Sequence, residues 1–374
     1  LLLRDNASTL RVDAGTLSVA EVTQGDFNDY IRVTGQVEPI TTVQLSPLEA
    51  GVVERLVVEE GASVRRGDVL VELSNPSLTL EILNSEAELA EKQNLLRNTL
   101  ISMEQEKLTL RQNKAQLDLD VARKRRAFEQ NDELYAHRLI AREEWLQAKE
   151  DWELELMRKA QAITDRAFAE VITRIKPGMT ELELQAELIY CMYKNGGTGL
   201  AFDPIVVSGP NTSLPHGVAG ERVIQKGDFV TMDFGASYMG YCSDMTRTVA
   251  VGYATDEMKH VYDTVLKAQL TAIAVTKAGV PGKDIDGTAR KVIADAGYGE
   301  YFGHGYGHSL GLEIHEAPNL SFRNPDPIPA GAVCSAEPGI YLPGKFGVRI
   351  EDVTIITEDG CEDITGSPKN LIIV

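Results

Sequence analysis

The sequence predicts an α+β fold in which a mixed domain follows a β segment and a long helical hairpin. Residues 17–75 are rich in Val, Ile and Thr, with Gly between the runs, which is typical of strands. Residues 78–155 contain neither Gly nor Pro and are rich in Leu, Glu, Gln, Lys and Arg, which favours helix. Helical patterns then alternate with short strands and Gly/Pro turns, which indicates an α+β domain. The predicted domains are therefore residues 1–76, 77–155 and 156–374.

The β segment is clearest in "GVVERLVVEEGASVRRGDVLVEL", residues 51–73. Gly51, Gly61 and Gly67 separate short valine-rich runs there. The runs have the length and composition of strands, and the glycines suit the turns between them. We therefore expect short strands in this part of the chain.

The helical region carries an apolar residue at every seventh position. These residues are Ile82, Leu89, Leu96, Met103, Leu110 and Leu117. Such a stripe favours a helix packed on a partner as a coiled coil, although the second seam position is poorly filled. The stripe breaks within residues 135–145, where we expect the chain to turn as a helical hairpin. We expect residues 145–175 to form a continuous or nearly continuous helix that leads into the mixed domain.

The mixed domain begins with two predicted helices, residues 156–175 and 181–195. Between them, "IKPGMTELEL" indicates a helix end, a Pro-Gly turn and the start of a new helix. Glu183 follows Thr180 by three residues, which is the spacing of a capping box. We therefore expect Thr180 to cap the second helix.

The composition is that of an ordinary globular protein. Of 374 residues, 43% are hydrophobic and 25% are charged, which is enough apolar material for a real core. The formal net charge is −19, which argues against nucleic acid as a partner. No stretch approaches the roughly 20 apolar residues that cross a bilayer. An enzyme and an interaction protein both remain open as function classes.

Acidic residues recur in the strand-like parts of the mixed domain. Asp233 and Asp244 are eleven residues apart around a Gly-containing turn, so a hairpin could bring them together. Glu337 and Glu351 are fourteen residues apart in a similar setting, and His308 lies in the glycine-rich stretch "GHGYGHSLGLEIHEAP". Four carboxylates and one imidazole are too many charges to bury together without cations. Although any single acid could be a solvated turn residue, the five together predict two divalent metals.

These motifs resemble the catalytic domain of the aminopeptidase P, prolidase and methionine aminopeptidase superfamily, the pita-bread metallopeptidases. The resemblance covers residues 156–374 and implies a dinuclear centre. Its ligands would be Asp233, Asp244, His308, Glu337 and Glu351. Oxygen-rich ligation with one His suits Mn²⁺ first, with Co²⁺, Fe²⁺ or Zn²⁺ as alternatives.

The resemblance also implies further catalytic residues. His315 matches a histidine that contacts the substrate, His216 matches another active-site histidine, and Arg349 matches an arginine near the site. His304 matches a histidine at the rim that assists proton movement, although a purely structural role stays open for it. Glu337 is expected to take a proton from the nucleophilic water and to pass it to the leaving amine.

The implied activity is hydrolysis of the N-terminal Xaa-Pro bond of a peptide by a metal-bridged hydroxide. The sequence "LPHG" around His216 resembles the proline-directed members, whereas methionine aminopeptidases usually carry Cys before that histidine. We therefore expect an enzyme of the Xaa-Pro aminopeptidase or dipeptidase type, a metallo-aminopeptidase that acts on peptide substrates. A homodimer is one of the oligomeric states left open.

Residues 17–155 instead resemble part of a periplasmic adaptor, or membrane-fusion, subunit of bacterial efflux pumps. The matching features are a half-lipoyl segment at residues 45–75, the long helix and "NDELYAHRLIAREEW" at the hairpin tip, residues 131–145. After Val71 the segment runs "ELSNPSL" without a lysine for a carrier arm, so it is expected to be structural. The return half of the adaptor's sandwich is not found before the peptidase motifs begin.

The adaptor resemblance supplies an alternative function. In that reading the chain is an adaptor fragment, an interaction module that reaches a channel or pump partner through its hairpin, with the peptidase domain as a fused passenger. The two resemblances also imply different locations, cytoplasmic for the peptidase half and periplasmic or membrane-associated for the adaptor-like half. A natural fusion, a designed chimera and a mis-assembled sequence all stay open as origins.

Overall fold

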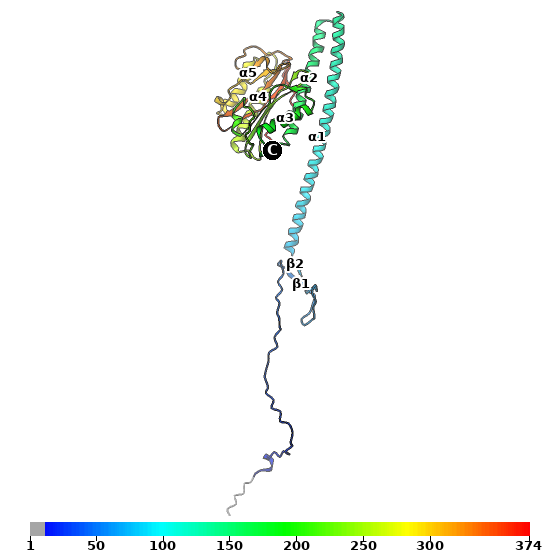
Figure 1. Ribbon diagram of the computed structural model, residues 1–374, viewed down its shortest axis with the longest axis vertical. Coiled ribbons are helices and arrows are strands. Elements are labelled where there is room, and N and C mark those ends of the chain that lie inside the picture. Colours follow the sequence, from blue (N-terminus) through cyan, green and yellow to red (C-terminus); the bar gives the residue numbers. More distant parts are fainter. Residues whose placement is uncertain (1–11) are drawn as a thin grey trace, which may run out of the picture. The chain divides into compact units, whose positions relative to one another are not determined.

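The computed structural model describes residues 12–374 and divides the chain into two compact units, Leu1–Arg97 and Asn98–Val374. The boundary between the units lies inside a helix and coincides with neither predicted boundary, 76 nor 155. The first eleven residues of the predicted β segment lie outside the described part. Figure 1 shows the elements of both units.

The first unit contains one antiparallel pair of strands, β1 (Val52–Leu56) and β2 (Val71–Ser74), and a short 3₁₀ helix at Ala14–Thr16. An ion pair between Arg55 and Glu72 crosses the strands at 2.9 Å. Residues 17–50 form no strand, so the predicted β structure is wrong for this stretch. A sheet needs three or more strands or a packed face to be stable by itself. The side chains of β1 and β2 are almost all exposed, so this pair offers residues 17–50 no packed sheet to extend. The half-lipoyl segment is therefore not seen.

Two long helices follow, α1 (Pro76–Ala136) and α2 (Arg142–Val171), and the chain turns between them as predicted. The end of α1 packs on the start of α2, with ring centroids 4.9 Å apart for Phe128 and Trp152 and 5.0 Å apart for Tyr135 and Trp145. Because the second half of α2 enters the mixed fold, only its first half pairs with the end of α1 (Figure 1).

The coiled-coil prediction is not supported for the first half of α1. Four stripe residues that precede the paired part of the helix are exposed: Ile82 (51%), Leu89 (59%), Leu96 (60%) and Met103 (61%). A coiled-coil seam would bury these side chains against a second helix. The side chain of Leu110 is outside the described part of the structure, and Leu117 is half-buried.

The second half of α2 packs with α3 (Glu181–Lys194) on one side of the mixed fold. Both parts of the predicted capping box are present, because Glu183 N–H donates to Thr180 Oγ1 at 3.1 Å and Thr180 N–H donates to Glu183 Oε2 at 2.9 Å. The first strands of this unit are β3 (Gly199–Leu200), β4 (Ile205–Ser208), β5 (Phe229–Phe234), β6 (Ala236–Tyr238), β7 (Tyr241–Cys242) and β8 (Met245–Ala250). Strands β4, β5 and β8 form one antiparallel sheet, and β3, β6 and β7 form another.

The last part of the chain adds two helices and seven strands. The helices are α4 (Asp256–Ile273) and α5 (Gly282–Asp295), and short 3₁₀ helices lie at Gly209–Ser213 and Gly299–Tyr301. The strands are β9 (Gly307–Ser309), β10 (Glu316–Leu320), β11 (Val333–Ala336), β12 (Gly339–Leu342), β13 (Phe346–Arg349), β14 (Asp352–Ile356) and β15 (Cys361–Asp363). They form a five-stranded sheet in the order β10-β9-β11-β14-β15 and a β12-β13 hairpin.

The sheets meet near their centres, and the helices cover them from outside. Glu351 N–H donates to the carbonyl of Thr246 at 3.1 Å, which joins the start of β14 to β8. One buried core lies under α4 and α5, and a second lies under α2 and α3. The line along which β8 and β14 meet is therefore held on both sides, and the acidic residues lie on it. Among residues 12–374, no helix has both the length and the apolar character that a membrane span requires.

Candidate metal centre

A cavity of about 370 Å³ opens where the two sheets meet. It is lined by all nine residues that the sequence analysis selected. These are His216, Asp233, Asp244, His304, His308, His315, Glu337, Arg349 and Glu351. Residues that are far apart in the sequence therefore lie at one site. The role of each residue stays a prediction.

The two aspartates come from neighbouring strands. Asp233 lies near the end of β5, and Asp244 directly precedes β8. The strands pair so that Asp233 is opposite Thr246, which places Asp244 just beyond the end of the ladder. The connection is more elaborate than the single turn expected from the sequence, because β6 and β7 form their own hairpin between the two aspartates. The two carboxylates nevertheless reach the same cavity.

The two glutamates are brought together in the same way. Glu337 directly follows β11, and Glu351 directly precedes β14. Ala336 pairs with Asp352 in the antiparallel ladder, so the next residues, Glu337 and Glu351, are opposite each other. The β12-β13 hairpin occupies the sequence between them.

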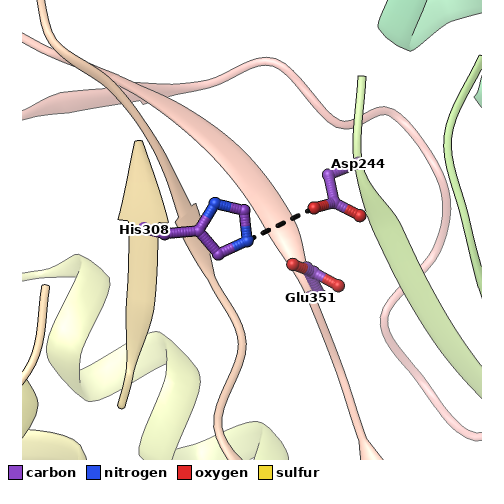
Figure 2. Close-up of side chains that lie close together, drawn as sticks. All are labelled: Asp244, His308 and Glu351. Atoms are coloured by element: carbon purple, nitrogen blue, oxygen red, sulfur yellow. Dashed lines mark ion pairs between the residues drawn. The ribbon is translucent and has the colours of Figure 1, made fainter. Parts of the chain in front are cut away.

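His308 lies on β9, which pairs with β11 in the five-stranded sheet. Its Nε2 atom is 3.5 Å from Asp244 Oδ2 and 3.6 Å from Glu337 Oε1. One donor atom from each of Asp244, His308 and Glu351 lies within 4.8 Å of the others, and Figure 2 shows these three side chains pointing toward one another. Position 307, directly before this histidine, has room only for glycine, because a Cβ at Gly307 would lie 2.0 Å from the carbonyl oxygen of Ser335.

The carboxylates are in an unfavourable environment for negative charge. Burial, followed by the negative charges of neighbouring carboxylates, raises the pKa values of Asp244 and Glu351 well above the usual range. Burial also raises the pKa of Glu337 to about 8. The Oδ1 atoms of Asp233 and Asp244 are buried without a hydrogen-bond partner. Such a group of oxygens is stabilised when cations bind between them.

These residues fit a divalent metal centre. Four carboxylates and one imidazole are the donors that hard and borderline divalent cations prefer. Burial lowers the pKa of His308 to about 4, so its imidazole is neutral at pH 7, which is the form that binds a metal. The two unpartnered aspartate oxygens are free acceptors at the place where a cation would be needed. Asp233, Asp244, His308, Glu337 and Glu351 are therefore the residues that could hold it.

Arg349 is buried beside this cluster and connects several parts of the wall. Its guanidinium forms an ion pair with Asp233 Oδ2. It also donates to the hydroxyl of Tyr341 at 2.9 Å and to the carbonyl of Pro215 at 3.1 Å. Pro215 directly precedes His216, so Arg349 links an acidic residue of the cluster to the segment that carries this histidine.

The three remaining histidines occupy different depths of the cavity. His304 is half-buried, with its Nδ1 atom 2.8 Å from the carbonyl of Gly305 and its Nε2 atom 2.8 Å from the Tyr341 hydroxyl. Burial and the nearby Arg349 lower the pKa of His304 to about 4. His216 and His315 are exposed, and the ring of His315 lies 4.4 Å from that of His308. The exposed pair is therefore available to a ligand, whereas His304 is already bonded within the protein.

Sequence reasoning missed two polar residues and the apolar wall. Tyr341 contacts both His304 and Arg349, and Thr246 bonds to Glu351 and Arg349. Phe202 and Ile205 line the cavity beside the histidines. The two polar residues face neighbours that are distant in sequence, so no local motif marks them. The spacing of Thr246, two residues after Asp244, is the only signal that could have found it.

Comparison with known proteins places this geometry in context. Residues 155–358 match the model of metallopeptidase family M24. The chain is 49% identical over 226 residues to the uncharacterized peptidase YqhT of Bacillus subtilis and 43% identical over 224 residues to an Xaa-Pro dipeptidase of Pyrococcus horikoshii. Each match covers 60% of this chain and 64% of the relative, so the chain spans less than two thirds of their length. The solved Xaa-Pro dipeptidase from Bacillus anthracis gives a TM-score of 0.59 at 52% identity, over 59% of this chain and 62% of that one.

The family match begins at residue 155 and therefore gives no support to the adaptor resemblance of residues 17–155. The channel or pump partner, the homodimer and the two expected locations stay predictions from sequence. The same holds for the three alternative origins of the chain.

Proposed function

The chain belongs to metallopeptidase family M24, and we propose that it hydrolyses the bond between the first residue of a peptide and a proline in second position. The observation that carries this proposal is the cavity in which four carboxylates and His308 meet beside three further histidines. The similarity to proteins named Xaa-Pro dipeptidase supports the choice of substrate. The sequence Leu-Pro-His around His216 supports the same branch of the family.

Two divalent cations would be held by Asp233, Asp244, His308, Glu337 and Glu351, with Mn²⁺ as the first candidate. When bound, they supply Lewis-acid polarisation and activate water at neutral pH. The chain contributes the negative charge that holds them in place. Backbone pairing fixes the ligands within each sheet, and the hydrogen bond from Glu351 N–H to the Thr246 carbonyl joins the two sheets beside them.

The protein groups around the cations perform the proton transfers and bind the substrate. Glu337 accepts the proton of the attacking water and delivers it to the leaving nitrogen, because its carboxylate lies beside His308 among the predicted ligands and is charged once cations neutralise the cluster. His216 and His315, which are exposed at the cavity, donate hydrogen bonds to the carbonyl oxygen as its negative charge develops. Proline carries no N–H, so a site for Xaa-Pro needs an apolar surface more than a hydrogen-bond acceptor at that position. Phe202, Ile205 and Pro215 provide such a surface.

The test is an assay of the full chain after removal of metal and stepwise addition of Mn²⁺. We expect two Mn²⁺ per chain and hydrolysis of Ala-Pro and of longer Ala-Pro peptides. Asp244→Asn is the matched control, because it keeps the side-chain shape and removes a ligand charge. Faster release of Met from Met-Ala peptides than of Ala from Ala-Pro peptides would assign the chain to the methionine branch. A chain that binds Mn²⁺ and cleaves neither class would contradict the proposed activity.

A further inference from the structure

The hydroxyl of Thr246 lies between two ionisable side chains of the candidate site. Thr246 is the second residue of β8 and is fully buried. Its Oγ1 atom is 2.6 Å from Glu351 Oε2 and 2.9 Å from Nε of Arg349. A buried hydroxyl with a carboxylate on one side and a guanidinium on the other makes two charge-assisted hydrogen bonds, which are stronger than neutral ones.

The direction of both hydrogen bonds is fixed by chemistry. A guanidinium can only donate, so Arg349 Nε–H donates to the threonine oxygen. The threonine proton is then left for the other neighbour, and the hydroxyl donates to Glu351 Oε2. This arrangement requires that Oε2 is an acceptor, and it holds the plane of the carboxylate. The other oxygen, Oε1, is left for a different partner.

The backbone at Thr246 holds the same glutamate. The Thr246 carbonyl accepts the N–H of Glu351 at 3.1 Å, so one residue of β8 binds both the main chain and the side chain of Glu351. Arg349 continues the network, because its guanidinium also pairs with Asp233. Asp233, Arg349, Thr246 and Glu351 therefore form one continuous chain of contacts. This chain of contacts connects a predicted ligand on β5 to a predicted ligand at the start of β14.

We infer that Thr246 is a positioning residue that sets the orientation of the Glu351 carboxylate and, through Arg349, of Asp233 for metal binding. The inference rests on the metal centre of the proposed function. It assigns Thr246 no contact with substrate. Residues that orient metal ligands change metal affinity by about 10–100-fold when they are replaced. Replacement of Thr246 should therefore lower metal affinity as well as turnover.

A matched control lies two residues further along the same strand. Thr248 is also buried, but its hydroxyl donates to the Arg349 carbonyl at 3.0 Å, accepts the Arg349 backbone N–H at 3.3 Å and lies 3.0 Å from the hydroxyl of Thr231. It therefore contacts main chain and another neutral side chain. Thr246→Val and Thr248→Val each exchange a hydroxyl for a methyl group at a buried site of one strand. Only the first exchange removes a bond to a predicted metal ligand.

The experiment measures Mn²⁺ binding to the full chain by calorimetry, and the absorption spectrum of the Co²⁺-loaded protein. We expect Thr246→Val to weaken Mn²⁺ binding by about 10–100-fold and to alter the Co²⁺ spectrum. Thr248→Val should bind Mn²⁺ and Co²⁺ as the wild type does. Thr246→Ser keeps the hydroxyl and should restore affinity to within about threefold of the wild type, well inside the 10–100-fold loss. Thermal unfolding of the metal-free proteins shows whether both valine variants are folded.

The outcomes are distinguishable from failure of the proposed function. Unchanged Mn²⁺ affinity in Thr246→Val, or an equal loss in Thr248→Val, would overturn the positioning role. If Thr246→Val does not fold, Thr246→Cys replaces it, because a thiol is larger than the serine hydroxyl but takes its place in the side chain and bonds weakly. Equal affinity of the Cys and Ser variants would then overturn the role. A wild type that binds Mn²⁺ without cleaving Xaa-Pro peptides would contradict the activity, and the order of the variants would still decide the role of Thr246.

Discussion

Glu337 is the residue to which the proposal gives two tasks, metal ligation and proton transfer. Its carboxyl lies 3.6 Å from His308 and accepts a hydrogen bond from Ser335 at 3.4 Å. Burial raises the pKa of the metal-free carboxyl to about 8, and cations bound beside it would favour the charged form, which is the form that accepts a proton. A group in this position is expected to be sensitive to loss of its charge.

Glu337→Gln should therefore abolish measurable turnover, with a loss of kcat above about 100-fold, because proton transfer by a positioned group contributes at least that factor. His304→Ala should reduce kcat less, because both ring nitrogens of His304 are bonded within the protein and neither binds a metal in this scheme. The measurement is steady-state hydrolysis of an Xaa-Pro peptide at saturating Mn²⁺. A larger kcat loss for His304→Ala than for Glu337→Gln would reverse the assigned roles.

The site was predictable from sequence to the extent that its residues lie in recognisable local motifs. Asp233 and Asp244 lie at the adjoining ends of β5 and β8, which pair directly although β6 and β7 lie between them in sequence, so their meeting follows from local pairing. Thr246 and Tyr341 could not be selected in this way. Thr246 acts on Glu351, which is 105 residues away, and Tyr341 on His304, which is 37 residues away. Only the assembled sheets bring these partners into contact.

At the scale of elements, the start of α3 holds the segment that carries His216. Glu181 is the first residue of α3 and is fully buried. Its Oε1 atom accepts bonds from the N–H and the hydroxyl of Ser208, at 2.7 and 2.8 Å, and from the amide of Asn211 at 3.1 Å. Its Oε2 atom accepts from the N–H of Gly220 at 3.1 Å. One carboxylate thus fastens both ends of the segment from residue 208 to residue 220.

Glu181→Gln should loosen this segment, because the amide nitrogen would face donors and leave at least one of them unpaired. Such a loss costs about 1–3 kcal/mol of unfolding free energy. We expect KM for an Xaa-Pro peptide to rise more than kcat falls, since His216 is proposed to contact the substrate and the predicted metal ligands lie on other segments. Denaturant unfolding and steady-state kinetics measure the two effects.

Glu183→Gln is the control on the same helix turn. Glu183 is exposed and accepts the Thr180 N–H, and glutamine can serve equally well in a capping box. The unfolding free energy of this variant should stay within about 0.5 kcal/mol of the wild type. Equal effects of the two substitutions on KM would show that Glu181 does not act through the His216 segment.

Elements were predicted well where the signal was local and strong. The absence of Gly and Pro indicated the long helices, and α2 runs without a break through most of the stretch expected to be continuous. The capping box at Thr180 gave the start of α3. The β prediction for residues 17–50 failed because valine-rich composition favours strands only where neighbouring strands are present to pair with. The coiled-coil prediction for α1 failed for the same reason. The seven-residue period indicates an apolar face, but it does not show that a second helix covers this face, and the stripe is exposed.

At the scale of the whole molecule, the question is whether the peptidase fold depends on the residues before it. The buried members of the two large cores all lie within residues 163–356, and the partly buried residues packed on them extend to Val374. The third, smaller cluster begins at Met157. Contacts from the hairpin to α2 are made by residues such as Phe128, which stacks on Trp152, and Asp118, which pairs with Lys159. These contacts lie outside the three cores.

Deletion of residues 1–150 should therefore leave a folded domain that binds Mn²⁺ with the stoichiometry of the full chain. Lys159, which is buried beneath the hairpin, would lose Asp118 but would gain water when α1 is removed, so no isolated charge is left buried. Limited proteolysis of the full chain should give a stable C-terminal fragment that begins near residue 155. Near-UV circular dichroism, Mn²⁺ calorimetry and mass spectrometry of the fragment test these outcomes. If the deleted protein unfolds, or if residues 17–75 prove to be protected from protease by the unit that contains residues 156–374, the N-terminal part is an integral domain of this chain and the two resemblances describe one cooperative structure.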